Sequence, residues 1–332
     1  MTRFQRIMVT ACGGDIGIGL GRIIRRAKPT GRLVGCDIHT DHAGSAFFDV
    51  CERSLPANDP VYLDCLLSLV RKHRVDLIVL GSEQELRWAY EAGVQNNLDG
   101  VPVIMVNRQT LAVGLDKLAT ASFLEANSLP YPWSVPVSNG FPPQLPCIVK
   151  ARTGAGSKGV YVVSDQELAD YYVRKYPLAI WQEYLLPDDQ EYTCGLFRAK
   201  SGETRHIIFK RRLQGGFTGS GETVDHPGMA CVLRRLAEGL DLCGSINVQL
   251  RLTSRGPIIF EINPRFSSTV VFRHLLGFHD LLWSIQDIGD CPLGAYASPP
   301  AGIRFYRTSQ EVFCPALSLS NNQFVEEDYE DR

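Results

Sequence analysis

The sequence predicts an α/β fold in which a parallel, doubly wound sheet precedes a two-lobed α+β region. In the first third of the chain, short apolar segments alternate with amphipathic segments of helical period, which is typical of a parallel sheet with helices on both faces. After about residue 190 the apolar segments are longer and follow a period of two, which indicates antiparallel strands. A proline-rich stretch at 136–146 can hardly continue a helix and marks a boundary between these patterns.

The same patterns place the individual elements. In the first part we expect strands at 6–11, 32–37, 76–80 and 101–106, and helices at 17–26, 62–73 and 83–92. A helix at 116–127 then leads to a small lobe with strands at 147–151, 160–163 and 179–184 and a helix at 165–175. The rest has strands at 191–198, 205–212, 245–253 and 256–263, and helices near 228–240 and 279–288.

Composition excludes several classes of protein. The 332 residues are 45% hydrophobic and 21% charged, which predicts a globular chain of two or three domains. A net charge of -2 does not suit a protein built to neutralise nucleic acid or anionic lipid, and no apolar run is long enough to span a membrane. We therefore expect a cytoplasmic protein whose partners are small molecules.

The ten cysteines are scattered, without a closely spaced pair of the kind that predicts a zinc site. We expect most of them to be reduced, small core residues. Cys12, beside the first glycine turn, has no visible base and is assigned no role.

A metal site is predicted where an apolar strand at 256–263 ends in polar residues. Side chains alternate along a strand, so Glu261, Asn263 and Arg265 share one face. Gln249, on the preceding strand, can share that face across a hairpin that turns near 254–256. Carboxylate and amide oxygens suit Mg²⁺, and Arg265 supplies a cationic fork for a phosphoryl group.

A second motif is a buried strand that runs into a glycine-rich turn and out into another strand. Backbone N–H groups in such a turn can approach phosphate oxygens, and lysines bring positive charge. It is not a Walker A loop, because a strand follows instead of a helix. An ordinary glycine hairpin explains the same pattern equally well. The candidate phosphate ligands here are Lys150, Gly154, Gly156, Ser157 and Lys158.

A third motif is the strand end Gln182-Glu183-Tyr184-Leu185, followed by Glu191. Its polar groups could meet the edge of an adenine, and the carboxylate of Glu191 could accept ribose hydroxyls. The order of glycine loop, acidic residue and paired metal strands within about 180 residues makes the three motifs stronger together than singly.

In this order the motifs resemble the ATP-grasp superfamily, and especially its carbamoyl-phosphate-synthase-like branch. In that family a Rossmann-like domain precedes a helix that opens with Asp-Lys, here Asp116-Lys117. The resemblance implies a Rossmann-like pre-ATP-grasp domain at 1–112, a small lobe at 113–188, a C-terminal lobe with the metal site at 189–318, and a flexible tail at 319–332.

The resemblance also assigns roles to the residues of the motifs. It implies that Lys117 and Lys150 contact the phosphates of ATP, and that Glu191 contacts the ribose. Arg265 would face an acyl phosphate. The adenine would be contacted by Gln182, Glu183 and Leu185, and Mg²⁺, as two ions or replaced by Mn²⁺, by Gln249, Glu261 and Asn263.

The run at 209–221 is similar to the basic strand and flexible loop that lie along the phosphates in this branch. Lys210 and Arg212 share one face of an alternating strand, and Arg211 lies on the other. We expect Lys210 to point inward as a phosphate ligand, with Arg212 beside it. A solvated basic strand is the alternative.

A single ATP-grasp unit of this kind resembles carboxylate-amine ligases. The implied reaction is attack of a carboxylate on the γ-phosphate, followed by attack of an amine or thiol on the acyl phosphate, with release of ADP and phosphate. The alternatives are a nucleotide sensor without turnover and an enzyme that makes a carbamoyl- or carboxy-phosphate type of product. A homodimer is expected from the resemblance alone.

Three further features leave alternatives open. The glycine turn at 13–19, with Asp37 ending the second strand, invites the interpretation that it binds NAD, although its spacing is not GxGxxG. Glu83 could hold a substrate amine, or belong to a helix start capped by a serine. Ser267 and Ser268 could contact substrate, or cap the next turn.

Overall fold

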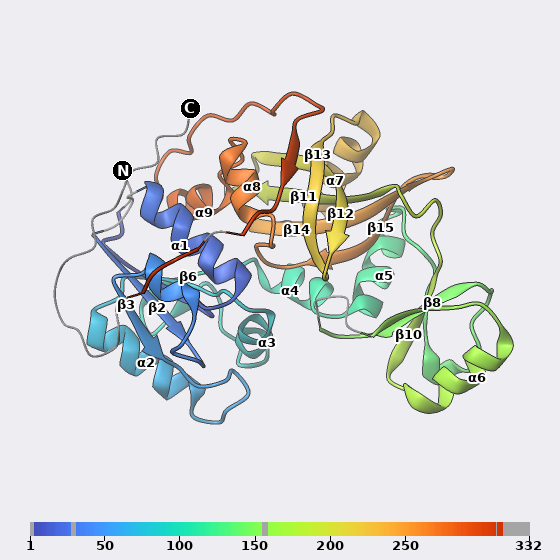
Figure 1. Ribbon diagram of the computed structural model, residues 1–332, viewed down its shortest axis with the longest axis horizontal. Coiled ribbons are helices and arrows are strands. Elements are labelled where there is room, and N and C mark those ends of the chain that lie inside the picture. The colour runs from blue at the N-terminus through green and yellow to red at the C-terminus, as the bar shows by residue number, and fades with distance from the viewer. Residues whose placement is uncertain (1–2, 28–30, 155–158, 310, 315–332) are drawn as a thin grey trace.

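The computed structural model describes residues 3–27, 31–154, 159–309 and 311–314. Figure 1 shows three sheets: a parallel sheet that carries the N-terminal part, a large sheet beside it, and a small sheet set apart at the far end of the large one. The predicted α/β class, with a doubly wound sheet before a two-lobed region, is confirmed. The predicted domain limits stay predictions.

The N-terminal part is a six-stranded sheet of order β3-β2-β1-β4-β6-β5. All its pairings are parallel except that of β5 with β6. The predicted strands and helices are present within a few residues of their expected limits. The bounds are β1 Arg6–Thr10, α1 Asp15–Ala27, β2 Arg32–Asp37, β3 Val50–Arg53, α2 Tyr62–His73, β4 Leu77–Val79, α3 Glu83–Glu91, β5 Asn97–Leu98 and β6 Val101–Ile104.

Two helices join this sheet to the rest of the chain. The sequence analysis missed α4, Arg108–Gly114, and found α5, Lys117–Ala126. Asp116 caps α5 by accepting hydrogen bonds from the backbone N–H groups of Leu118 and Ala119. Leu111 and Leu124 are buried in a core that continues from the parallel sheet to the large sheet. The helix that opens with Asp-Lys is therefore held rigidly against the large sheet.

The small lobe is a four-stranded antiparallel sheet of order β7-β10-β8-β9. Trp181 is fully buried at its centre and donates a hydrogen bond to the carbonyl oxygen of Gly140. The lobe has its own core, which explains why it stands apart in Figure 1. Its elements are β7 Ser134–Pro136, β8 Cys147–Ala151, β9 Val160–Val163, α6 Gln166–Lys175 and β10 Ala179–Glu183.

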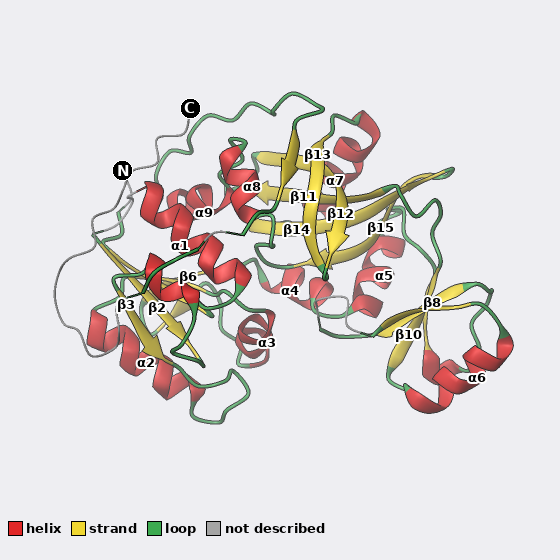
Figure 2. Cartoon of the chain, viewed as in Figure 1, coloured by secondary structure: helices red, strands yellow, loops and turns green. Residues whose placement is uncertain are grey.

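The large sheet has the strand order β15-β14-β11-β12-β13-β16 and is antiparallel throughout. Figure 2 shows it as the central block of strands, with helices on both sides. Its elements are β11 Glu191–Arg198, β12 Thr204–Gln214, β13 Phe217–Thr223, α7 Pro227–Gly239, β14 Gly244–Thr253, β15 Gly256–Asn263, α8 Val270–Leu275, α9 Asp280–Ile288 and β16 Arg304–Tyr306.

Both faces of the large sheet are covered. Cys194 and Ile208 face α7, whose Leu233 packs in the same core. On the opposite face, Phe209 packs with Trp283 of α9. The sheet is therefore apolar on both sides over much of its length, and its polar site has to form where the strands run beyond these cores.

One expectation about this sheet is wrong. The segment after β12 was expected to be a flexible loop, yet Phe217–Thr223 is strand β13 and pairs with both β12 and β16. Gly221 allows the close packing, because a Cβ there would lie 2.6 Å from the ring of Phe305. Among the described residues, no helix is long and apolar enough to cross a membrane.

Candidate functional site

A cavity of about 640 Å³ lies between the small lobe and the large sheet. It brings residues from all three predicted motifs to one place. The lining includes Lys117, Lys150, Gly154, Gln182, Glu183, Tyr184, Leu185, Glu191, Gln249 and Glu261, all of which the sequence analysis singled out. The other predicted residues of the glycine loop, Gly156, Ser157 and Lys158, lie outside the described residues.

Gln249 and Glu261 face each other across β14 and β15. They are register partners, and the two strands are joined by a two-residue turn between Thr253 and Gly256, as the sequence analysis expected. The register shifts after this pair, so that Phe260 is the extra residue of a bulge, and its ring also lines the cavity. The bulge leaves the carboxylate of Glu261 next to the carboxamide of Gln249 at the cavity wall.

The carboxylate of Glu261 accepts no hydrogen bond from any residue that the structure describes. Its neighbour Gln249 does have a partner, because its Oε1 accepts a hydrogen bond of 3.0 Å from Arg211. A half-buried carboxylate without donors is costly unless a cation or water binds it. The pair is therefore a candidate for cation binding.

Asn263 lies one pleat further along β15. It pairs with Asn247 of β14, it is buried, and its Oδ1 accepts a hydrogen bond of 3.3 Å from Arg265. It does not line the large cavity. The structure therefore places Asn263 on the same face as Glu261, as the alternation predicted, but deeper and next to Arg265.

Two lysines line one end of the cavity. Lys150 of β8 is buried, and its Nζ donates a hydrogen bond of 3.3 Å to the carbonyl oxygen of Phe260. The pKa of Lys150 is lowered to about 8, mainly by burial; the negative charge of Glu261 opposes this shift and the positive charge of Lys117 adds to it. The Nζ of Lys117 donates a hydrogen bond of 2.7 Å to the carbonyl oxygen of Gly154. The amine of Lys117 is thus held at the start of the glycine-rich turn, and that of Lys150 is held against β15.

The other end of the cavity has apolar walls and a polar edge. Ile148, Val160, Val162 and Leu185 contribute the apolar side chains. A flat apolar space with a few fixed polar groups is the usual form of an adenine or similar aromatic site.

The polar groups of this edge are held by their neighbours. Gln182 donates a hydrogen bond of 3.0 Å to Ser134. Glu183 pairs with Arg255 at 2.5 Å, and its Oε2 is buried without a partner among the described residues. Tyr184 donates to Asp188 at 2.6 Å.

Two arginines hold Glu191. Arg211 contacts one of its oxygens at 2.6 Å, and Arg251 contacts the other at 2.9 Å. Both arginines line the cavity, and neither was predicted. Arg251 lies two residues from Gln249, so period-two alternation from Gln249 was a signal that could have found it.

The expected orientation of Lys210 is wrong. In the β11–β12 register, Lys210 is opposite Tyr192, on the face that packs toward α7. Arg211 is on the other face, with Glu191 and Gln249. Lys210 and Arg212 are absent from the lining of the 640 Å³ cavity and line a neighbouring polar cavity of about 670 Å³, which Arg211 and Glu191 also line. Arg211 is therefore the cation that the strand presents to Gln249.

Arg265 lies at the junction of the parallel sheet and the large sheet. Its Nε is 3.8 Å from Glu83 at the start of α3, so two residues from opposite ends of the chain meet here. Ser82 also forms the expected cap, in a reciprocal capping box with Glu85. The helix start capped by Ser82 is confirmed, and the role of Glu83 toward a substrate amine stays a prediction.

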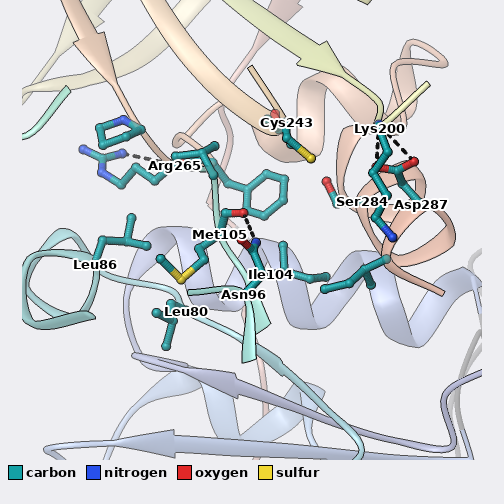
Figure 3. Close-up of a pocket in the computed structure, with 16 residues that line it drawn as sticks. Leu80, Leu86, Asn96, Ile104, Met105, Lys200, Cys243, Arg265, Ser284 and Asp287 are labelled. Carbon is teal, nitrogen blue, oxygen red and sulfur yellow. Dashed lines mark hydrogen bonds between the residues drawn. The ribbon is translucent and has the colours of Figure 1, made fainter. Parts of the chain in front are cut away.

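Figure 3 shows another cavity, of about 200 Å³, which Arg265 helps to line. Leu80, Leu86 and Met105 line it from the side of the parallel sheet, and Cys243 lines it from the large sheet. Ser267 does not reach this cavity or the larger one, since it is buried and bonded to Thr269 and Arg273. Ser268 is held through its carbonyl oxygen, which accepts a hydrogen bond from Arg307.

A buried arginine that the sequence analysis missed supports β14 and β15 from behind. Arg273 is fully buried, pairs with Asp280 at 3.2 Å, and donates hydrogen bonds to Asn247 and Ser267. Asn247 is the register partner of Asn263. The position of Asn263 is thus fixed by a buried ionic network, which no local sequence pattern reveals.

The glycine turn after β1 has a structural explanation. A Cβ on Gly17 would lie 2.2 Å from the carbonyl oxygen of Ala11, so close packing of helix on strand requires glycine there. Asp37 accepts a hydrogen bond of 2.9 Å from the backbone N–H of Gly13. In an NAD site this aspartate would bind a ribose. Here the carboxylate of Asp37 is hydrogen-bonded to the backbone of the turn.

Comparison with known proteins agrees with this geometry. Residues 176–303 match the family described as ATP-grasp in the biosynthetic pathway with Ter operon. No curated protein matches the sequence. An ADP complex of N5-carboxyaminoimidazole ribonucleotide synthetase has a similar structure, with a TM-score of 0.70 at 16% identity over 91% of this chain and 81% of that one.

Two further solved structures show the same similarity. N5-carboxyaminoimidazole ribonucleotide synthetase from Thermus thermophilus gives a TM-score of 0.69 at 17% identity, over 90% of this chain and 81% of that one. The biotin carboxylase domain of 2-oxoglutarate carboxylase from Hydrogenobacter thermophilus, bound to MgADP and bicarbonate, gives 0.69 at 14% identity, over 90% and 72%. The chain therefore matches an ATP-grasp family model over residues 176–303 and shares its fold with these synthetase and biotin carboxylase structures.

Proposed function

We propose that the protein is an ATP-dependent ligase that activates a carboxylate as an acyl phosphate and transfers the acyl group to an amine or a thiol. One observation carries the proposal. The paired Gln249 and Glu261, the lysines Lys117 and Lys150, and the polar edge at 182–185 line one cavity. A cation site, phosphate-binding charge and a base-sized slot are what phosphoryl transfer from ATP requires.

The donor set fits Mg²⁺. Glu261 offers a carboxylate without donors among the described residues, and Gln249 offers an amide oxygen, both oxygen ligands of the kind a hard cation prefers. Mg²⁺ bound there would neutralise charge on the β- and γ-phosphates. Asn263, deeper on the same face, would complete the ligand set. The number of ions and a use of Mn²⁺ are part of the proposal.

Positive charge surrounds the proposed phosphate position. Lys150 and Lys117 lie on the small-lobe side, and Arg211 lies on the large-sheet side. Their side chains would orient the γ-phosphate for in-line attack, so catalysis would rest on positioning and charge neutralisation. Arg265, paired with Glu83, would bind the carboxylate or the acyl phosphate, with Glu83 near the incoming amine.

Bicarbonate is a specific second candidate for the carboxylate. One structural neighbour is a biotin carboxylase domain with bicarbonate bound, and two others are N5-carboxyaminoimidazole ribonucleotide synthetases. The corresponding reaction here would form a carboxy-phosphate type of intermediate. A homodimer and a cytoplasmic location are proposed with the enzyme.

The test is ADP release from MgATP in separate pools of organic acids, amino acids and bicarbonate, each with and without amines and thiols. Glu261→Gln is the control that removes the charge and keeps the shape. Release that depends on an acceptor and is lost in the variant would support the ligase and name its substrate class. Hydroxylamine added to the active pool would trap an acyl phosphate as a hydroxamate. Tight ATP binding with no ADP release in any pool would favour a nucleotide sensor instead.

A further inference from the structure

A compact group of metal-ligating side chains lies in the N-terminal part, outside the ATP-grasp site. Cys12 follows β1, Asp37 ends β2, and His42 follows in the next loop. One ligand atom from each of the three lies within 4.8 Å of the others. The Sγ of Cys12 is 3.8 Å from the Nε2 of His42, and 4.0 Å from the Sγ of Cys51 in β3.

We propose that Cys12, Asp37, His42 and Cys51 form a zinc site that joins the loops at the carboxyl end of the parallel sheet. In a tetrahedral zinc site, bonds of about 2.0–2.3 Å place neighbouring donor atoms about 3.3–3.8 Å apart. The two contacts of the Cys12 sulfur, at 3.8 and 4.0 Å, are at or slightly above this range, and the donor atoms of Cys12, Asp37 and His42 all lie within 4.8 Å of one another. Cys51 is close to Cys12 alone, so the side chains would have to rotate inward for all four to bind one ion. Thiolate, imidazole and carboxylate together suit zinc better than magnesium.

Three glycines hold these side chains close together. A Cβ on Gly13 would lie 2.7 Å from the ring of His42, and one on Gly35 would lie 2.8 Å from the Sγ of Cys12. A Cβ on Gly44 would lie 2.9 Å from the Nδ1 of His42. Any larger residue at these positions would push the imidazole or the thiol away. The local backbone is therefore built around the contact between Cys12 and His42.

The protein's own hydrogen bonds do not satisfy every ligand atom of the cluster. The Nε2 of His42 contacts the Sγ of Cys12 at 3.8 Å, and its Nδ1 is buried without a partner among the described residues. Cys12 is fully buried with its sulfur directed at His42 and Cys51. Zinc binding would displace the proton of the Cys12 thiol. Asp37 already accepts hydrogen bonds from two backbone N–H groups, which fix its carboxylate in place.

The experiment uses the full chain without a histidine tag, purified with a non-chelating reductant. Zinc content is measured by mass spectrometry, and Co²⁺ is then exchanged in as a spectroscopic probe. We expect one equivalent of zinc, and a thiolate-to-cobalt charge-transfer band with the intense visible bands of a tetrahedral site. Cys12→Ser and His42→Ala should each reduce the bound metal at least about tenfold.

The matched controls are His39→Ala, an exposed histidine three residues from His42, and Cys231→Ser, an exposed cysteine on α7. Both should bind metal like the unchanged protein. If Cys12→Ser fails to fold, the metal content of Cys51→Ser and the cobalt spectrum of the unchanged protein still test the site. A reduced protein that binds neither zinc nor cobalt, a cobalt spectrum without the thiolate band, or full metal content in Cys12→Ser and His42→Ala would each overturn the site. A Cys12–Cys51 disulfide in a chain that binds no zinc after reduction would overturn it as well.

Discussion

Two glutamates in this molecule have opposite surroundings. Glu85, under the parallel sheet, is buried and accepts hydrogen bonds from Thr10, Tyr62 and Ser82. Glu261, on the large sheet, faces a cavity and has no donor among the described residues. The first carboxylate is saturated by the protein, and the second can accept a cation. The contrast shows how hydrogen-bond partners distinguish a structural acid from a ligand.

The arginines give the same contrast. Arg273 is fully buried and bound to Asp280, Asn247 and Ser267, whereas Arg211 lines the cavity beside Glu191 and Gln249. Arg273 fixes the strands from behind, and Arg211 adds charge where phosphates would bind. Arg273 is therefore a supporting side chain of the large sheet, whereas Arg211 is available to a ligand in the cavity.

The largest effect is expected from Glu261→Gln. The change removes the charge that would hold Mg²⁺, so magnesium-dependent ADP release should fall at least about 100-fold, the usual cost of losing one transition-state electrostatic contact. The melting temperature should stay nearly unchanged, because no described residue donates to this carboxylate. Coupled ADP assays and calorimetry measure both quantities. Retained activity would remove Glu261 from the metal site.

The same substitution at Glu85 should have the opposite outcome. A carboxamide cannot accept from all of the donors that surround Glu85, so Glu85→Gln should lower the free energy of unfolding by about 1–3 kcal/mol. ATP affinity should stay within about twofold, because Glu85 lies outside the nucleotide cavity. Denaturant titration measures the free energy of unfolding, and a nucleotide-binding titration measures the ATP affinity. A stable variant with weakened ATP binding would reverse the assignment of the two glutamates.

Arg211→Met and Lys210→Met test the corrected face of β12. Arg211→Met should weaken MgATP binding by about tenfold, the effect of losing one charge-assisted contact. Lys210→Met, one residue away on the other face, should change it much less. Titration calorimetry on both variants compares them directly. A larger loss in Lys210→Met would restore the orientation expected from the sequence.

The smallest effect is the pH dependence of nucleotide binding. The pKa of Lys150 in the free protein is about 8, mainly because of burial, and phosphates bind the charged form. MgATP affinity should therefore be highest below pH 8 and fall several-fold above it, with proton uptake on binding. Calorimetry in buffers of different ionisation enthalpy measures the uptake. Lys150→Arg, which stays charged, should bind with no such uptake.

The sequence predicted that Gln249 and Glu261 lie side by side because both signals were local. Alternation placed Glu261 on one face, and a two-residue turn set its pairing with Gln249. The order of motifs then pointed to the ATP-grasp resemblance, and a family model of that kind matches residues 176–303. Local patterns of this kind do not depend on contacts with distant parts of the chain. Most of the residues expected to bind nucleotide therefore line the cavity.

The misses have tertiary causes. Ile207, Ile208 and Phe209 are all buried, because helices cover both faces of β12, so the apolar pattern does not show which face Arg211 takes. Strand β13 has two glycines among its seven residues, and it pairs on one side with β16, far later in the chain. The cysteines and histidine of the proposed zinc site come from separate segments that only the parallel sheet brings together.

The most direct test of the account is an experimental structure of the chain with MgADP. We predict the adenine against Gln182–Leu185, the phosphates near Lys150 and Lys117, and the cation in contact with Glu261. A nucleotide bound instead at the glycine turn after β1, or a cation away from Glu261, would contradict the central claim that this cavity is the ATP site.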